Sequence, residues 1–172
     1  DRARAQRLAT DALRGLDRAD RMLKPYLKKS PPDHVMNALR LGVIELCGGE
    51  AAHGVVNAYV EIVGRNKRTQ AMKGLTNAVL RKIAAEGPEG WAKRAVPLTP
   101  GWLRQPLVAA WGRDAVTGME AAHFTGAPLD LTAKSDPAGV AKAVGGTLLP
   151  TGSIRIADAG QVSTLPGYDT GD

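Results

Sequence analysis

The sequence contains a single cysteine, Cys47, so it cannot form an internal disulfide framework or a thiolate-based zinc site. Cys47 lies at the end of an apolar helical run, and we interpret it as a buried thiol. The histidines, His34, His53 and His123, are too widely spaced for a short metal-binding motif. We therefore assign no metal to the chain.

Long apolar runs are also missing. No segment approaches the roughly 18 to 20 apolar residues that a membrane-spanning helix needs, so we expect no membrane contact. The opening stretch, DRARAQRLATDALRG, is interrupted by charges throughout and does not resemble a secretory signal. We expect a cytoplasmic location. Aromatic residues make up only 4% of the chain against 44% apolar residues, a globular composition that favours helices.

Catalytic motifs are absent as well. The sequence has no G-x-S-x-G, no P-loop and no G-x-G-x-x-G loop after a strand. Cys47, Glu50 and His53 could form a Cys-His nucleophile, but such partners usually come from distant segments, so we favour structural roles. Gly145 and Gly146 precede a strand and predict a turn rather than a phosphate-binding loop. We assign no catalytic and no cofactor-binding residue.

Positive charge is what the chain does have, and it is concentrated. The net charge is +6 with a pI near 9.7, and residues 65–94 carry eight cations against two anions, which equals the net charge of the whole chain. A second cluster, Lys24, Lys28 and Lys29, lies just before the sequence SPPD. Clustered cations are typical of proteins that bind phosphate backbones. This distribution predicts nucleic acid as the leading partner.

Hydrophobic periodicity predicts five helices in the first half of the chain. The apolar face of the first comprises Ala5, Leu8, Ala9, Ala12, Leu13 and Leu16, and a second short helix spans residues 18–27 with Pro25 near its end. In SPPD we expect Ser30 as the N-cap and Pro31 at the first position of a helix that buries Val35, Met36, Leu39, Val43 and Leu46 and ends at Gly48. A fourth helix, residues 53–65, would bury Val55, Val56, Tyr59, Ile62 and Val63. With a fifth, these elements predict an all-α bundle.

The fifth helix, which contains KGLTNAVLRK, has two distinct faces. At 100° per residue the inner arc holds Met72, Leu75, Thr76, Val79, Leu80 and Ile83, and the outer ridge holds Gln70, Lys73, Asn77 and Arg81. Gly74 and Ala78 lie between them and would allow a helix or a nucleic-acid backbone to approach closely. An ordinary solvated cationic face is the alternative reading of this ridge.

Composition changes at AEGPEG, residues 85–90, where we expect the helix to end and a boundary to lie. Shorter helices follow, with Trp91, Trp102 and Trp111 interleaved with cations. These tryptophans could form a base-stacking surface, but we favour packing between helices. Residues 129–134 and 153–158 alternate as strands around a capped helix with Pro137 at its first position, which predicts a small α/β unit.

Residues 40–83, RLGVIELCGGEAAHGVVNAYVEIVGRNKRTQAMKGLTNAVLRKI, resemble the second half of a NusB-like domain. The segments TPGWLRQPLVAAWGRDAV, APLDLTAKSD and LLPTGSIRIADAGQVSTLPGYDTGD resemble the linker and small α/β unit of the RsmB (Sun, Fmu) family of ribosomal RNA cytosine-5 methyltransferases. The expected fold class is therefore mainly α, a NusB-like helical bundle followed by a short helical linker and a small, incomplete α/β unit. The expected domains are residues 1–86, 87–126 and 127–172.

This resemblance implies that the chain is the RNA-binding amino-terminal part of an S-adenosylmethionine-dependent 16S ribosomal RNA (cytosine-5) methyltransferase. The family's earliest helix would precede Asp1, and its catalytic domain would follow residue 172. The family's Gly-rich cofactor loop and its Pro-Cys and Thr-Cys catalytic motifs do not occur here, and Cys47 matches neither motif. We therefore expect S-adenosylmethionine to be the cofactor of the parent protein only, with small-subunit ribosomal RNA and the methyltransferase domain as partners.

The candidate RNA contacts are the cations Arg65, Lys67, Arg68, Lys73, Arg81 and Lys82, with Asn77 as a hydrogen-bonding partner or a helix-packing amide. Six phosphate contacts would give a slope of log affinity against log salt of roughly 4. Two alternatives stay open at this point. The chain could be a NusB-like transcription antitermination or ribosome-assembly factor without enzymatic activity, or its basic face could dock on an acidic surface of the methyltransferase domain.

Overall fold

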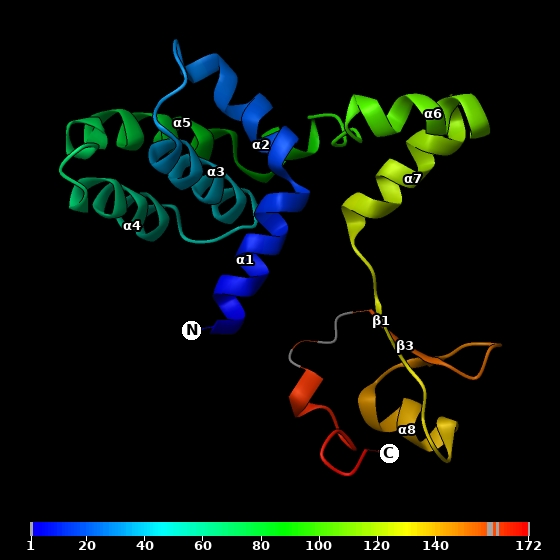
Figure 1. Ribbon diagram of the computed structural model, residues 1–172. Coiled ribbons are helices and arrows are strands. Elements are labelled where there is room, and N and C mark those ends of the chain that lie inside the picture. The colour runs from blue at the N-terminus through cyan, green and yellow to red at the C-terminus, as the bar shows by residue number, and fades with distance from the viewer. Residues whose placement is uncertain (1, 158–159, 161, 172) are drawn as a thin grey trace. The chain divides into compact units, whose positions relative to one another are not determined.

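The computed structural model describes residues 2–157, 160 and 162–171 (Figure 1). Within these residues the chain forms eight α-helices and one three-stranded antiparallel sheet, which confirms the expected fold class. The chain divides into two compact units, Asp1–Phe124 and Thr125–Asp172. The finer division into a bundle, a linker and an α/β unit stays a prediction.

The first unit is built on a five-helix bundle. Its elements are α1 (Arg2–Arg14), α2 (Leu16–Leu23), the 3₁₀ turn η1 (Lys24–Tyr26), α3 (Asp33–Cys47), α4 (Ala52–Arg65), the 3₁₀ turn η2 (Gln70–Met72) and α5 (Lys73–Ala92). Helix α3 packs against α1, α2, α4 and α5 and lies at the centre of the bundle (Figure 1). A central helix must be apolar on several sides, and α3 buries residues on most of its turns.

The bundle core confirms most of the periodicity seen in the sequence. It contains fifteen buried hydrophobic residues, among them Leu39, Val43, Leu80 and Ile83 at 0% exposure. Gly42 sets the close approach of α3 to α5, because a Cβ at this position would lie only 2.7 Å from Leu80 Cδ2. The Leu80 side chain of α5 therefore packs directly against the backbone of α3 at Gly42.

Two predictions about helix starts were wrong. The second helix begins at Leu16 and not at residue 18, so Leu16 belongs to α2 and not to the first helix. Helix α3 begins at Asp33 with Pro32 as its N-cap, and no side chain caps it, so Ser30 is not the N-cap. The reason is the second proline: a residue that precedes a proline is disfavoured in helical geometry, so Pro31 cannot open the helix.

Four apolar residues assigned to the core lie at the surface instead. Leu13 is 75% exposed, Leu16 37%, Ile62 39% and Leu75 38%. Leu75 sits at the edge of the apolar arc of α5, about 90° from its centre at 100° per residue, and no neighbouring helix covers that edge. The apolar arc of α5 is therefore wider than the part of its surface that the neighbouring helices bury.

The Gly-Pro segment interrupts α5 without ending the unit. Gly87 has φ 55° and ψ −155°, and a last helical turn restarts at Pro88 and ends at Ala92. Helices α6 (Gly101–Trp111) and α7 (Arg113–Thr125) follow. Trp102 is 77% exposed and Trp111 66%, so packing between helices, which we favoured from sequence, is wrong for both. Only Trp91 packs against the bundle core.

Polar contacts attach α7 to the connection before α6. Glu120 is buried and accepts hydrogen bonds from Thr99 N (2.8 Å), Thr99 Oγ1 (2.9 Å) and Arg104 Nε (2.9 Å). The bond from Arg104, together with the bonds from Thr99, lowers the pKa of Glu120 to about 2. Glu120 therefore stays ionised at physiological pH and joins α7 both to Thr99 of the connection and to Arg104 of α6.

A buried arginine joins α2 to the end of α7. The guanidinium carbon of Arg18 lies 4.2 Å from the ring centroid of Phe124 and 5.2 Å from that of Trp91. Its Nε donates to the carbonyl of Ala95 at 3.2 Å. The cation is thus held by aromatic faces and a carbonyl, contacts that are strong when desolvated.

The second unit is a small α/β arrangement of β1 (Leu129–Leu131), α8 (Pro137–Val144), β2 (Thr147–Leu148), β3 (Ile154–Ile156) and the 3₁₀ turn η3 (Val162–Thr164). The sheet order is β1-β3-β2, antiparallel throughout. Asp136 caps α8 by accepting from Gly139 N at 3.0 Å, which confirms the capped helix and its first-position proline. Strand β2 was not predicted, because two residues carry no readable alternation.

Candidate nucleic-acid interface

The connection between α4 and α5 lies at one end of the bundle (Figure 1) and carries the exposed cations Lys67 and Arg68. Asn66 Oδ1 accepts from the backbone N–H of Arg68 at 2.9 Å, and the Asn66 carbonyl accepts from Thr69 N at 2.9 Å. The buried Thr69 hydroxyl donates to the Val63 carbonyl at 2.8 Å. These bonds fix the turn and leave Lys67 and Arg68 exposed. The hydrogen bonds of Asn66 and Thr69 were not predicted from the sequence, although both residue types are common in turns.

Helix α5 begins with a lysine that lies along α4. A Cβ at Gly64 would lie 2.8 Å from Lys73 Cδ, so the aliphatic stem of Lys73 covers this glycine. The stem is thereby placed against backbone while the ammonium group stays in solvent. Gly64 thus determines how closely Lys73 approaches the α4–α5 turn.

Asn77 orients Arg81 one turn further along α5. Its Oδ1 accepts from Arg81 Nε at 3.2 Å, an interaction expected at i, i+4 spacing. This bond is made within α5, so both the RNA-contact role and the helix-packing role of Asn77 stay predictions. Within the described residues the two η nitrogens of Arg81 have no carboxylate partner, so they can donate to a ligand.

Arg65 is the only cation of this group with an ion pair in the described part of the chain. Its guanidinium lies 3.6 Å from Glu61, and both side chains are more than two-thirds exposed. Exposed pairs of this kind contribute about 0.3–0.5 kcal/mol and break easily. We define the loop surface by the residues that the structure brings together here: Arg65, Lys67, Arg68, Lys73, Asn77 and Arg81.

Lys82, the seventh candidate residue, does not belong to the loop surface. One residue along a helix is a turn of about 100°, so Lys82 points away from Arg81. Its Nζ lies 5.2 Å from the ring centroid of Tyr26 in η1. The Tyr26 hydroxyl donates to Glu86 at 2.7 Å, which fixes the ring under the ammonium group.

The thiol and histidine near Gly48 do not form a nucleophilic pair. Cys47 Sγ lies 3.8 Å from Met22 Sδ and 3.7 Å from the Gly87 carbonyl, whereas His53 contacts Asn57. Burial raises the pKa of Cys47 to about 11, so the thiol is neutral at physiological pH. Across the described residues, no group of three His, Cys, Asp or Glu side chains could hold a metal ion.

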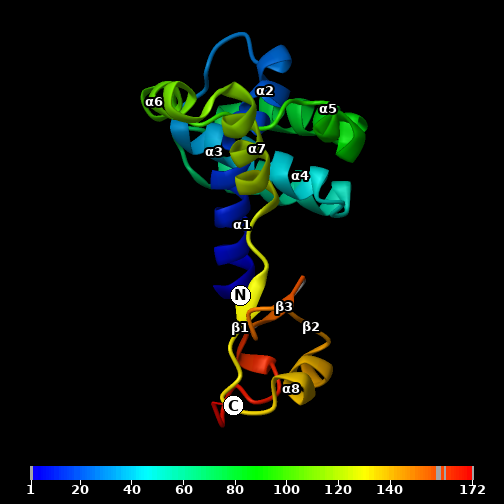
Figure 2. The ribbon, with the colours of Figure 1, turned by 90° about the vertical axis from the view of Figure 1, so that its right-hand side faces the viewer.

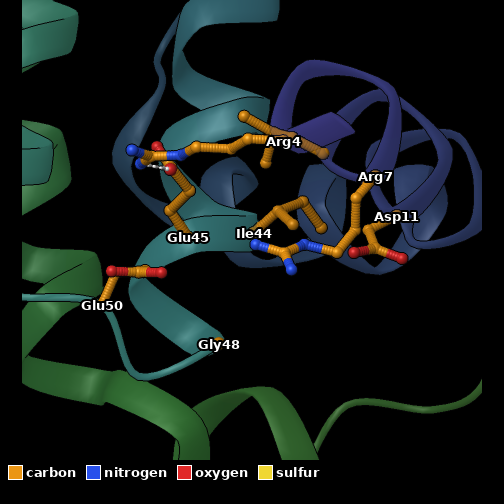
Figure 3. A pocket seen from close by; sticks show the side chains of 8 residues that line it. Arg4, Arg7, Asp11, Ile44, Glu45, Gly48 and Glu50 are labelled. Atoms are coloured by element: carbon orange, nitrogen blue, oxygen red, sulfur yellow. Dashed lines mark hydrogen bonds and ion pairs between the residues drawn. The ribbon is translucent and has the colours of Figure 1, made fainter. Parts of the chain in front are cut away.

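A polar pocket between α1 and α3 has its charges largely matched within the chain. Figure 3 shows Arg4 reaching Glu45, which also accepts from the Tyr59 hydroxyl at 2.8 Å. Arg7, Asp11 and Glu50 complete its polar lining. Burial and Glu45 raise the pKa of Tyr59, so its hydroxyl stays a donor. This network joins α1, α3 and α4 and has no arrangement of acid, base and nucleophile.

The fold and the loop surface together define a small helical module with a cationic end. Residues 1–85 match the model of the NusB family. This match supports the NusB-like domain that the resemblance implied for this part of the chain. Neither the curated proteins nor the solved structures include a significant match to the chain.

A helix that crosses a bilayer must be both long and apolar. Among the described residues, no helix meets both conditions for crossing a membrane.

Proposed function

We propose that the chain binds RNA through the loop surface of its NusB-like domain. The observation that carries this proposal is the set of cations Arg65, Lys67, Arg68, Lys73 and Arg81, which a rigid turn and the first turns of α5 hold at one end of the bundle. Phosphate groups are the ligands for such a surface, since neutralised phosphates release counterions. A NusB-like domain fits this function.

The finer proposal is that the RNA is small-subunit ribosomal RNA and that the chain positions it for an S-adenosylmethionine-dependent cytosine-5 methyltransferase domain in the cytoplasm. It is supported by the resemblance of the segments after the bundle to the linker and small α/β unit of RsmB-type enzymes. The coding sequence beyond Asp172 tests it. A Gly-rich strand-to-helix loop and a Pro-Cys motif are expected there, and a stop codon would contradict this finer proposal.

The RNA proposal is tested with the double variant Lys73→Glu, Arg81→Glu. Affinity for a labelled small-subunit ribosomal RNA fragment, measured by fluorescence anisotropy, should fall at least about tenfold, because two phosphate contacts become repulsive. The matched control is Arg113→Glu, Lys142→Glu, which makes the same charge change at exposed positions of α7 and α8. The control should bind RNA within about twofold of the original chain.

Equal losses in the two double variants would show that only net charge matters and would contradict the loop surface. Unchanged binding in both would contradict RNA binding through this surface altogether.

An assembly factor that uses protein contacts is the second candidate function. The exposed tryptophans of α6 favour it, because large exposed apolar side chains mark interaction sites. RNA binding that survives the double reversal, with loss of a protein partner on Trp102→Ala, would favour this candidate.

A further inference from the structure

The position of Lys82 reveals a second basic surface on the bundle. Its ammonium group lies over Tyr26, and Tyr26 belongs to η1, which begins with Lys24. Lys28 and Lys29 follow within three residues of Tyr26 in the exposed connection to α3. In Figures 1 and 2 this connection rises on a different side of the bundle from the α4–α5 turn. We define the lysine surface as Lys24, Lys28, Lys29 and Lys82.

The charge of the lysine surface is not neutralised by nearby acids. In the part of the chain that the structure describes, none of its members has an ion pair with a carboxylate. The acids of the surrounding elements face other arginines instead. Glu86 accepts from Arg94 at 2.9 Å and from Tyr26 at 2.7 Å, and Asp20 receives a bidentate contact from Arg40.

Of two further acids on α2 and α3, only one has an ion pair among the described residues. Asp17 pairs with Arg21 one turn later on α2. Asp33 contributes to the field that raises the pKa of Arg40, after the larger contribution of Asp20. The lysine surface therefore carries four cations that no ion pair among the described residues neutralises.

Helix α5 separates the lysine surface from the loop surface without a steric barrier. Gly74, Ala78 and Ala85 occupy its outer side, and all three are exposed. No atom lies within 4 Å of a Cβ built on Gly74. A polyanion chain can therefore cross α5 close to its backbone and meet cations on both flanks.

We propose that the lysine surface is a second RNA-contact site that holds backbone phosphates of the same RNA molecule bound by the loop surface. This inference rests on the proposed function. The chemistry of the two surfaces differs. Lysine is a flexible point charge suited to phosphate, whereas the Arg81–Asn77 pair offers planar donors and an amide that suit base edges. The lysine surface therefore positions the RNA, and the loop surface can also discriminate among bases.

RNA length and salt give quantitative expectations. An RNA of about 6 nucleotides, with about five internucleotide phosphates, matches the five cations of the loop surface, and one of about 16 nucleotides can reach both surfaces. At about 0.7 per phosphate, the five cations of the loop surface give a salt slope of about 3.5. Adding the lysine surface raises the slope for the longer RNA to about 6.

The test compares the double variant Lys28→Glu, Lys29→Glu with the loop-surface double and the Arg113, Lys142 control, all in the 172-residue chain. Both lysines lie in an exposed connection without side-chain partners among the described residues, so the reversal should not affect folding. For the longer RNA we expect at least about a fivefold loss of affinity and a slope lower by about 1.4. For the short RNA we expect a change within about twofold.

Three results decide between the surfaces. If the lysine double binds the longer RNA like the control while the loop-surface double is impaired, this inference is overturned and the proposed function stands. If both RNA lengths lose affinity equally in the lysine double, the spanning arrangement is wrong. If none of the doubles affects binding, the proposed function fails and the inference fails with it.

Discussion

The α1–α5 bundle and the α6–α7 segment belong to one compact unit, yet different forces hold them. The bundle buries fifteen hydrophobic residues in a single core. Helix α6 buries none of its residues, and α7 buries only Val116 and Glu120. Both regions are rich in apolar residues. The difference shows that apolar composition becomes core only where partner helices surround it.

The attachment of α7 depends on directional contacts instead. Glu120 binds Thr99 and Arg104, and Arg18 lies between the rings of Phe124 and Trp91. Loss of one directional contact should loosen α7 locally, whereas a cavity in the packed core should lower the stability of the whole bundle. The bundle and the segment should therefore respond differently to the same kinds of change.

The largest effect is expected in the bundle core. Leu39→Ala removes a fully buried side chain and should lower the free energy of unfolding by about 2–5 kcal/mol. Leu13→Ala, at a 75% exposed position of α1, is the matched control and should change it by less than about 0.5 kcal/mol. Urea denaturation followed by circular dichroism measures both. Similar losses in the two variants would contradict the assigned core.

The next effect concerns Glu120. Glu120→Gln replaces charge-assisted bonds with neutral ones and should destabilise the α6–α7 segment by roughly 2 kcal/mol. Hydrogen exchange should speed up in α7 and leave α3 unchanged. Glu89→Gln, an exposed position of α5, provides the control and should affect neither helix.

The same carboxylate predicts a pH dependence. The pKa of Glu120 is lowered from 4.5 to about 2, so its ionised form stabilises the fold fully above pH 4.5. That contribution should be lost as the pH falls from 4.5 through 2, and Glu120→Gln should lack this part of the acid response. An unchanged acid profile in the variant would contradict the role of Arg104 and Thr99.

A smaller effect is expected at Arg18. Arg18→Ala removes two cation–π contacts and the bond to the Ala95 carbonyl, which should cost about 1–2 kcal/mol. Arg21→Ala, which breaks a half-exposed i, i+4 pair with Asp17, should cost about 0.3–0.5 kcal/mol. Equal effects on urea midpoints would show that the aromatic contacts contribute nothing.

The smallest perturbation uses the tryptophans as reporters without destabilising the fold. In single-tryptophan variants, acrylamide should quench Trp102 and Trp111 strongly and Trp91 weakly, because the first two are 77% and 66% exposed. Strong protection of Trp102 or Trp111 would mean that α6 has a packing partner. The comparison between the bundle and the segment would then have to be abandoned.

Local patterns explain what could be predicted from the sequence. Helix α3 follows from apolar spacing and a glycine stop, and α4 follows from apolar spacing. The Asn77–Arg81 contact follows from i, i+4 spacing. The exposed tryptophans could not be predicted, because periodicity does not say whether a partner helix is present. The Glu120 and Arg18 contacts join residues far apart in the chain.

The candidate site shows the same division. The cations could be counted from sequence, but their grouping depends on helix rotation and on contacts with other elements. Lys82 follows Arg81 directly, and yet it lies over Tyr26 on another side of α5. Asn66 and Thr69 shape the turn through hydrogen bonds, but they are neutral, so a search for clustered charge does not find them.

The most direct test of the central claim is the salt dependence of RNA affinity for the unaltered chain. We expect log affinity for an RNA of about 16 nucleotides to fall with log salt at a slope of about 6, and for one of about 6 nucleotides at about 3.5. A slope below about 1 for both lengths would contradict RNA binding through the basic surfaces of this bundle.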